Sequence, residues 1–233
     1  MEKILVIDDE KPTLNMFRLL LGAQGYDVLT AENGNEGIEV FERERPPLVL
    51  TDIKMPGMDG IEVLRRIKLI EPRTEVIVIT GHGDMDLAIK ALNLDATDFI
   101  NKPIQRSILE QALQRARERI LLLDSHEKQV VVESYGEAAA ILFRGNVTSS
   151  SEPQILEGFR EAFSMNREKI VLRFDPSVSF NGAGISILTQ QLLEAEKRGC
   201  RVTLTGLPEN FKKVFRLVGI THLAKVQDGE FDA

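Results

Sequence analysis

Five polar residues in the first half of the sequence stand at the ends of short apolar runs. They comprise an acidic pair, a third acid, a hydroxyl and an ammonium group: Asp8, Asp9, Asp52, Thr80 and Lys102. A single acid after an apolar run is usually a solvated turn residue or a helix cap. The presence of all of them, each in its place along the chain, predicts one shared site.

The chemistry that suits these groups is phosphoryl transfer. Three carboxylates close together raise one another's pKa unless a divalent cation neutralises them. Mg²⁺ prefers oxygen ligands, takes few carboxylates and keeps several waters. A carboxylate held at such a metal can attack a phosphoryl group, and a cation such as Lys102 stabilises the charge on the transferred group.

The elements that must position these groups alternate between two hydrophobic periods. Short apolar runs are typical of buried parallel strands, and they lie at residues 4–7, 28–29, 48–50, 76–79 and 99–100. The stretches between them carry apolar residues at helical spacing, as at Ile61, Leu64 and Ile67. This alternation predicts a doubly wound α/β fold, in which ligands bind beyond the carboxyl ends of the strands.

The overall composition favours a globular protein of two domains. The 233 residues are 43% hydrophobic and 28% charged, and the single cysteine, Cys200, excludes an internal disulfide. We expect a cytoplasmic protein, because no stretch approaches the roughly 20 apolar residues of a membrane span or the apolar region of a secretory signal. The net charge of −7, most of it before residue 128, argues against broad binding to nucleic acid or an acidic membrane.

Four segments of the first half together resemble the receiver domain of two-component response regulators. They are the acidic pair, the run after the third strand, a Thr-Gly-His-Gly segment and the run that ends in Lys-Pro: residues 8–9, 52–60, 80–83 and 98–103. The resemblance extends from residue 2 to about residue 122, and we expect a domain of residues 1–122. It implies a flavodoxin-like, five-stranded parallel sheet and phosphorylation by a cognate histidine kinase.

The resemblance also implies roles for the residues that handle the phosphoryl group. Asp52 is the phosphoacceptor, and Thr80 and Lys102 bind the phosphoryl group. Phe99 matches the aromatic residue that swings inward when Thr80 moves. The peptide bond before Pro103 is expected to be cis.

The implied cofactor is Mg²⁺, with Asp52 among its ligands. Asp9 binds the metal directly, Asp8 mostly through water, and the backbone carbonyl of Lys54 completes the protein ligands. Residue 54 also bears on an alternative, because phosphatases that resemble the haloacid dehalogenase group need a second acid two residues after the nucleophile. Lys54 stands there, so we expect a switch that gains and loses a phosphoryl group rather than a turnover enzyme.

Residues 104–128 are expected to form a long helix that closes the receiver domain and leads to the second half. Its apolar seam advances in alternating steps of four and three residues, through Leu109, Leu113, Ala116, Ile120 and Leu123. The charged residues expected on its other faces are Arg115, Arg117, Glu118 and Arg119. The first turns should pack on the receiver sheet. The remainder leaves three outcomes open, namely a homodimer through this helix, docking onto the second half, or a linker.

Residues 129–233 are expected to form a second α/β domain with helices against one mixed sheet. The expected strands include 130–132, 140–143, 170–174 and 201–205, and the expected helices are 153–165, one that ends near 196, and 209–218. This order, a glycine-bearing turn at 180–184 and a closing Gly-Leu-Pro segment resemble the STAS domain of anti-sigma-factor antagonists.

One departure from that family concerns the glycine-bearing turn. In the antagonists it carries an Asp and then a serine that a protein kinase phosphorylates. The aligned residues are Asn181 and Ala183, and alanine has no hydroxyl to modify. Ser186, further along, is expected to face the core or to cap the helix. We therefore expect control to have moved from this turn to Asp52.

The expected function is a response regulator whose phosphorylation changes the protein–protein interactions of its STAS-like half with a downstream partner. Basic residues between 197 and 225 are expected to form a solvated face or to dock an acidic partner. Two alternatives remain open, a DNA-binding transcriptional regulator and a STAS half that senses a small ligand. Nucleic acid is disfavoured because residues 129–233 contain neither a convincing helix-turn-helix nor aromatic residues interleaved with the basic ones.

Overall fold

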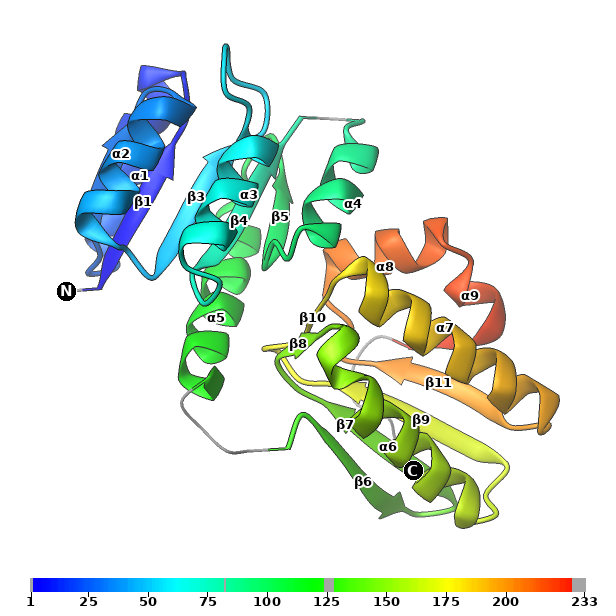
Figure 1. Cartoon of the computed structure of the whole chain (residues 1–233). Helices are drawn as coiled ribbons and strands as arrows, with labels where there is room; N and C mark the ends of the chain where they lie inside the picture. Colours follow the sequence, from blue (N-terminus) through cyan, green and yellow to red (C-terminus); the bar gives the residue numbers. More distant parts are fainter. Residues whose placement is uncertain (1, 82, 124–127, 228–233) are drawn as a thin grey trace. The chain divides into compact units, whose positions relative to one another are not determined.

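The computed structural model describes residues 2–81, 83–123 and 128–227. Its contacts divide the chain into two compact units, Met1–Leu123 and Asp124–Ala233, and each is described by itself (Figure 1). Across the described residues, none of the helices combines the length and apolar character that a bilayer span requires.

The first unit contains one parallel sheet of five strands in the order β2-β1-β3-β4-β5. The strands are β1 (Lys3–Ile7), β2 (Asp27–Ala31), β3 (Leu48–Asp52), β4 (Glu75–Thr80) and β5 (Asp98–Asn101). Every residue of β3 and β4 is buried, as expected for central strands with helices on both faces. The predicted flavodoxin-like sheet is therefore confirmed.

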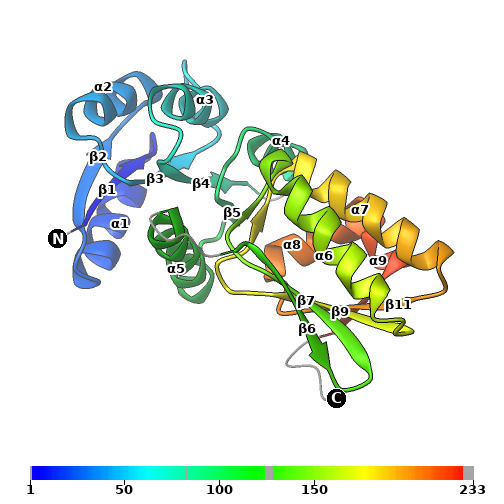
Figure 2. The ribbon, with the colours of Figure 1, turned by 60° about the horizontal axis from the view of Figure 1, so that its bottom comes forward.

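Helices cover both faces of this sheet. They are α1 (Lys11–Ala23), α2 (Gly34–Glu44), α3 (Gly60–Ile70), α4 (Met85–Asn93) and α5 (Arg106–Leu123). Figure 2 shows α1 and α5 on one face and α2, α3 and α4 on the other. Phe17 of α1 and Leu113 of α5 join Ile4, Leu50 and Ile79 of the strands in one buried cluster, which fixes the first of these layers.

Helix α5 starts later than expected, and its described part extends to Leu123. It begins at Arg106 rather than residue 104; residues 124–127 lie outside the described residues, and Lys128 is not helical. Leu109, Leu113 and Ala116 are buried in the core of the first unit, as predicted for the first turns. The expected seam is thus used within the domain over much of its length.

Two arginines of α5 contradict the expectation that they decorate exposed faces. Arg115 and Arg119 are each only 5% exposed. Arg115 Nε donates to Asp98 Oδ2 at 2.7 Å, and Arg119 pairs with Glu75 at 3.2 Å. Both acids begin strands of the sheet, so buried ion pairs fasten α5 to the amino ends of β4 and β5. Burial of an arginine of this kind requires such a partner.

The second unit contains a mixed sheet in the order β12-β11-β9-β7-β6, in which β6 runs antiparallel to β7. Its strands are β6 (Val130–Tyr135), β7 (Ala138–Phe143), β9 (Lys169–Phe174), β11 (Arg201–Thr205) and β12 (Lys225–Gln227), with a separate pair β8 (Asn146–Val147) and β10 (Ser179–Phe180). Its helices are α6 (Glu152–Ser164), α7 (Gly182–Lys197), α8 (Glu209–Leu217) and α9 (Ile220–Leu223), with the 3₁₀ turn η1 (Ser149–Ser151). Helices α6 and α7 lie along one face of the mixed sheet (Figures 1 and 2). The predicted mixed α/β second domain is confirmed.

Aromatic packing forms much of the core of the second unit. Phe180 lies 5.1 Å from Phe215 and 5.4 Å from both Phe174 and Phe211, measured between ring centroids. The rings meet edge to face, the arrangement that aromatic quadrupoles favour. This cluster joins β9, β10 and α8 and is independent of the core of the first unit.

Candidate functional site

Four strand ends of the first unit bring the predicted residues to one edge of the sheet. Asp8 follows β1, Asp52 and Thr80 end β3 and β4, and Lys102 follows β5. Lys102 Nζ lies 3.3 Å from Asp52 Oδ1 and 3.5 Å from Asp8 Oδ2. Asp8 is fully buried, and Asp52 and Thr80 are 5% and 1% exposed. One ammonium group therefore bridges two nearly buried carboxylates, because parallel strands place their carboxyl ends together.

The charges at this edge are only partly balanced. Burial raises the pKa of Asp52, with Lys102 opposing and the charges of Asp8 and Asp9 adding to the rise. Burial also raises the pKa of Asp8, against a hydrogen bond from the Glu10 backbone N–H at 2.8 Å and against Lys102. Burial lowers the pKa of Lys102, but the two carboxylates outweigh it, so this pKa is raised. A second cation would therefore be stabilised beside these acids.

The oxygen groups at this edge fit a hard dication such as Mg²⁺. Asp8 and Asp52 share the edge, and Asp9 is exposed next to Asp8. Over residues 2–81, 83–123 and 128–227, no three acidic, histidine or cysteine side chains are arranged to enclose a metal. Mg²⁺ does not need such a cage, because it binds through one or two carboxylates and keeps its waters.

The loop after β3 is held by contacts on both sides. Lys54 follows Asp52 by two residues, and its Nζ lies 2.9 Å from Asp84 Oδ1 at the start of α4. On the other side, Gly60 begins α3 so close to the backbone of Asp52 that an added Cβ would lie 2.0 Å from its carbonyl oxygen. Asp59 caps α3 by accepting from the Glu62 N–H at 2.8 Å. These contacts fix the backbone on which Asp52 stands.

The two residues expected to act as a switch, Thr80 and Phe99, lie on the neighbouring strands β4 and β5. Thr80 of β4 pairs in register with Asn101 of β5, and Phe99 lies two residues before Asn101. The Thr80 hydroxyl donates to Asn101 Oδ1 at 2.8 Å. Phe99 is 1% exposed, so its ring is already inside the protein in this conformation. The peptide bond between Lys102 and Pro103 is cis, as predicted.

Two site contacts were not anticipated from the sequence. Asn101 lies within residues 98–103, and the alternation of side chains along a strand predicts that it shares a face with Phe99. Asp84 had no such signal, because its pairing with Lys54 depends on how two loops fold.

The glycine-bearing turn of the second unit forms the start of α7. Asn181 is the N-cap, and its Oδ1 accepts from the Gly184 N–H at 2.9 Å. An added Cβ on Gly184 would lie 2.0 Å from the Val147 carbonyl oxygen, which explains the glycine there. Ala183 is exposed at the first turn. Ser186 is exposed too, so the expectation that it faces the core or caps the helix is wrong.

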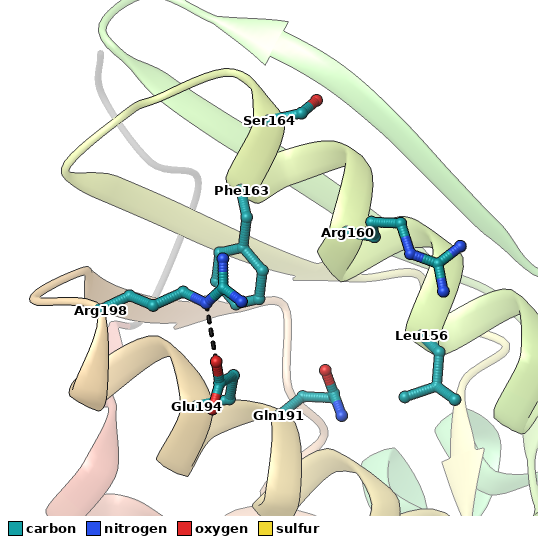
Figure 3. Close-up of a pocket in the computed structure, with 7 residues that line it drawn as sticks. All are labelled: Leu156, Arg160, Phe163, Ser164, Gln191, Glu194 and Arg198. Atoms are coloured by element: carbon teal, nitrogen blue, oxygen red, sulfur yellow. Dashed lines mark hydrogen bonds and ion pairs between the residues drawn. The ribbon is translucent and has the colours of Figure 1, made fainter.

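A groove between α6 and α7 has a volume of about 410 Å³ (Figure 3). Its lining residues come from both helices: Leu156, Arg160, Phe163, Ser164, Gln191, Glu194 and Arg198. The Arg198 guanidinium stacks on Phe163 with 4.4 Å to the ring centroid, and its Nε lies 2.8 Å from Glu194 Oε1. Arg160 forms an ion pair with Glu157. Because each arginine is paired with an acid, the groove does not concentrate charge of one sign.

The basic residues between 197 and 225 are distributed over several elements. They lie at the end of α7, at the start of β11, on α8 and on β12: Lys197, Arg198, Arg201, Lys212, Lys213, Arg216 and Lys225. Arg201 lies 3.5 Å from Glu168 and Lys212 lies 2.5 Å from Glu209, in addition to the Arg198 pair. Part of the positive charge is thus neutralised within the unit.

Comparisons with known proteins agree with this division. Residues 4–114 match the family described as response regulator receiver domain, and residues 130–226 match the family described as Mlab, STAS domain. The chain is 35% identical over 114 residues to sporulation initiation phosphotransferase F of Bacillus subtilis, a match that covers 49% of this chain and 92% of that protein.

A second relative and a solved structure extend the comparison. The transcriptional regulatory protein GlrR of Escherichia coli is 29% identical over 220 residues, covering 91% of this chain and 49% of that protein. The chain therefore spans about half the length of this relative. A receiver domain protein from Clostridium thermocellum is 42% identical with a TM-score of 0.51, covering 53% of this chain and 99% of that structure.

Receiver domains generally bind Mg²⁺ and receive a phosphoryl group from a histidine kinase at an aspartate. On the geometry of the sheet edge and on these matches, the chain belongs to the response-regulator receiver family and carries a STAS domain after its receiver domain.

Proposed function

We propose that this chain is a two-component response regulator in which a histidine kinase phosphorylates Asp52 with Mg²⁺, and the modification alters the protein interactions of the STAS domain. The observation that carries the proposal is the Lys102 ammonium, 3.3 Å from a carboxylate that is 5% exposed at the ligand-binding edge of a receiver sheet. Such a carboxylate is screened from bulk water and has its charge-stabilising cation already in place.

The transfer is a displacement at phosphorus. An Asp52 carboxylate oxygen bonds to phosphorus while the bond from phosphorus to the donor's imidazole nitrogen breaks, and that nitrogen keeps the electron pair. Asp8, Asp9, Asp52 and the Lys54 backbone carbonyl would hold Mg²⁺, which would supply positive charge for the phosphoryl oxygens. Lys102 pairs with one of these oxygens, and the Thr80 hydroxyl donates to another. The chain takes and loses the group at its own carboxylate, so we propose a switch rather than a turnover enzyme.

Phosphorylation with acetyl phosphate and Mg²⁺ tests the acceptor. The intact protein should gain one phosphoryl group by mass spectrometry, and Asp52→Asn should gain none. Asp59→Asn is a matched control in the same loop, because asparagine also serves as an N-cap. Modification of Asp52→Asn to the level of the wild type would refute the assignment of the acceptor.

The output is proposed to pass through the STAS domain to an unidentified protein partner in the cytoplasm. Asn181 and Ala183 support this, because a turn without a hydroxyl leaves Asp52 as the switch. Pull-downs with wild type, Asp52→Ala and Asp52→Glu should capture different amounts of this partner. Stoichiometric phosphorylation of residues 177–186 by a protein kinase would contradict this view.

A homodimer through α5 remains a proposal. Among the described side chains near the end of α5, Leu121 is 71% exposed and Ile120 is half-buried, so apolar surface remains there outside the core. Leu121→Glu should weaken the dimer in sedimentation experiments, with the exposed Leu19→Glu on α1 as the control. A sedimentation coefficient that is the same for Leu121→Glu and wild type at every concentration would exclude this interface.

DNA binding is the second candidate, favoured by the naming of GlrR as a transcriptional regulatory protein. A mobility shift that weakens with salt would support it. We rank it second because residues 130–226 match a STAS domain and the chain as a whole has a net charge of −7.

A further inference from the structure

The Thr80 hydroxyl already has a hydrogen-bond partner in this conformation. Its Oγ1 donates to Asn101 Oδ1 at 2.8 Å, whereas its distance of 3.5 Å to the Gly81 carbonyl oxygen is long for a hydroxyl donor. Thr80 and Asn101 are register partners at the ends of β4 and β5, so the sheet itself holds the two side chains together.

A threonine hydroxyl has one proton to donate. If that proton is shared with Asn101 Oδ1, it is not available to a phosphoryl oxygen on Asp52. The Asn101 amide oxygen and the phosphoryl group therefore compete for the Thr80 proton. In one conformation Thr80 donates to Asn101, and in the other it donates to the phosphoryl group.

We propose that Asn101 is a positioning residue that holds Thr80 in the unphosphorylated conformation, so that phosphorylation must break this hydrogen bond. The inference rests on the proposed function and deepens it, because it names a residue that sets the bias of the switch. The next residue, Lys102, contacts Asp52 and Asp8. The last residue of β5 and the residue after it thus favour opposite states of one site, Asn101 the unphosphorylated state and Lys102 the phosphorylated state.

The burial of Asn101 determines how strongly it favours the unphosphorylated conformation. The side chain is half-buried, so water can reach its amide once Thr80 has left. Moving Thr80 away then costs one ordinary hydrogen bond and does not leave a buried, unsatisfied acceptor. We therefore expect Asn101 to change the affinity of the site for a phosphoryl analogue by about threefold to tenfold.

Beryllofluoride, a phosphoryl analogue, provides the test with the full-length chain. Calorimetric titration with beryllofluoride and Mg²⁺ should give about threefold to tenfold tighter binding for Asn101→Ala than for the wild type. The affinity for Mg²⁺ alone should not change, because Asp8, Asp9 and Asp52 are untouched. Asn93→Ala, an exposed asparagine at the end of α4, is the matched control and should bind as the wild type does.

A double-mutant cycle separates this role from a merely structural one. In a Thr80→Ala background, which has no hydroxyl to hold, Asn101→Ala should have no effect; in Thr80→Ser, which keeps the hydroxyl, the effect should return. Asn101→Leu, closer to asparagine in size, replaces Asn101→Ala if the alanine variant does not fold.

Unchanged or weaker binding by both Asn101 variants overturns the inference, as does an equal gain in the Thr80→Ala background. Failure of the wild type to bind beryllofluoride at all would instead refute the proposed function. The two failures are therefore distinguishable.

Discussion

At the residue scale, Lys102 carries the charge balance of the site. It contacts both Asp52 and Asp8, and it opposes the effect of burial on the pKa of both acids. Lys102 directly follows β5, which contains the predicted apolar run, so the sequence predicted its place at this edge of the sheet. Its distances to the two acids could not be predicted, because they depend on the rotamer that the packed edge allows.

Replacing Lys102 with alanine should slow phosphorylation by acetyl phosphate by on the order of 10²-fold, because a preorganised charge is lost where the phosphoryl oxygens arrive. Initial rates at fixed pH and saturating Mg²⁺ measure this. Lys90→Ala, which removes an exposed lysine from α4, should leave the rate unchanged. A Lys102→Ala rate within twofold of the wild type would show that Lys102 is dispensable.

At the element scale, the start of α3 fixes Asp52 through close backbone contact. Gly60→Ala would place a methyl group 2.0 Å from the Asp52 carbonyl oxygen, and backbone cannot move aside cheaply. We expect a loss of about 2–4 kcal/mol in the free energy of unfolding of the receiver, together with slower phosphorylation. Urea unfolding measures the first effect.

Gly22→Ala in α1 is the matched control for this substitution. Nothing lies within 4 Å of its added Cβ, so the variant should be neutral or more stable by about 0.5–1 kcal/mol. If both variants were equally stable, the close approach of α3 to Asp52 would have no energetic importance.

Lys68 gives α3 a second role, in the dependence of stability on pH. Burial lowers its pKa to about 8 from the usual 10.5, while its Nζ donates to the Thr74 carbonyl at 2.8 Å. Between about pH 8 and 10.5 the unfolded state binds more protons than the folded state, so the free energy of unfolding rises with pH in this window. Below about pH 8, Lys68 is charged in both states, and its buried charge lowers the free energy of unfolding.

The comparison with Lys68→Met isolates this effect, because methionine is similar in shape and uncharged. From pH 7.5 to 10, the free energy of unfolding of the wild type should rise by about 1–2 kcal/mol relative to that of the variant, as measured by urea unfolding. This value is reduced because the Lys68 side chain is partly exposed. Parallel pH profiles for the two proteins would contradict a lowered pKa.

Elements with strong local patterns were predictable, and elements made by distant pairing were not. The apolar runs that became β1, β3 and β4 and the helical spacing of α3 are local signals. By contrast, β8 and β10 are two residues each and pair across a long gap, so no period marks them. The sequence predicted exposed faces for Arg115 and Arg119 because their acidic partners, Asp98 and Glu75, lie on other elements of the domain.

At the scale of the whole molecule, the two units have separate cores, and their functions should be separable by mutation. Phe180 lies at the centre of the aromatic cluster of the second unit, with ring centroids of Phe174, Phe211 and Phe215 within 5.4 Å. Phe180→Ala should destabilise the STAS domain by about 3–5 kcal/mol, since it leaves a cavity among packed rings.

The same variant should be phosphorylated at Asp52 to the same final extent as the wild type, because each unit buries its own hydrophobic core. Two readouts are needed: hydrogen exchange over residues 169–227 for the STAS domain, and mass spectrometry after acetyl phosphate for the receiver. Loss of phosphorylation together with increased exchange throughout residues 3–101 would mean that the receiver depends on the STAS core. Retained phosphorylation with loss of partner capture would place the output in the second unit and the chemistry in the first.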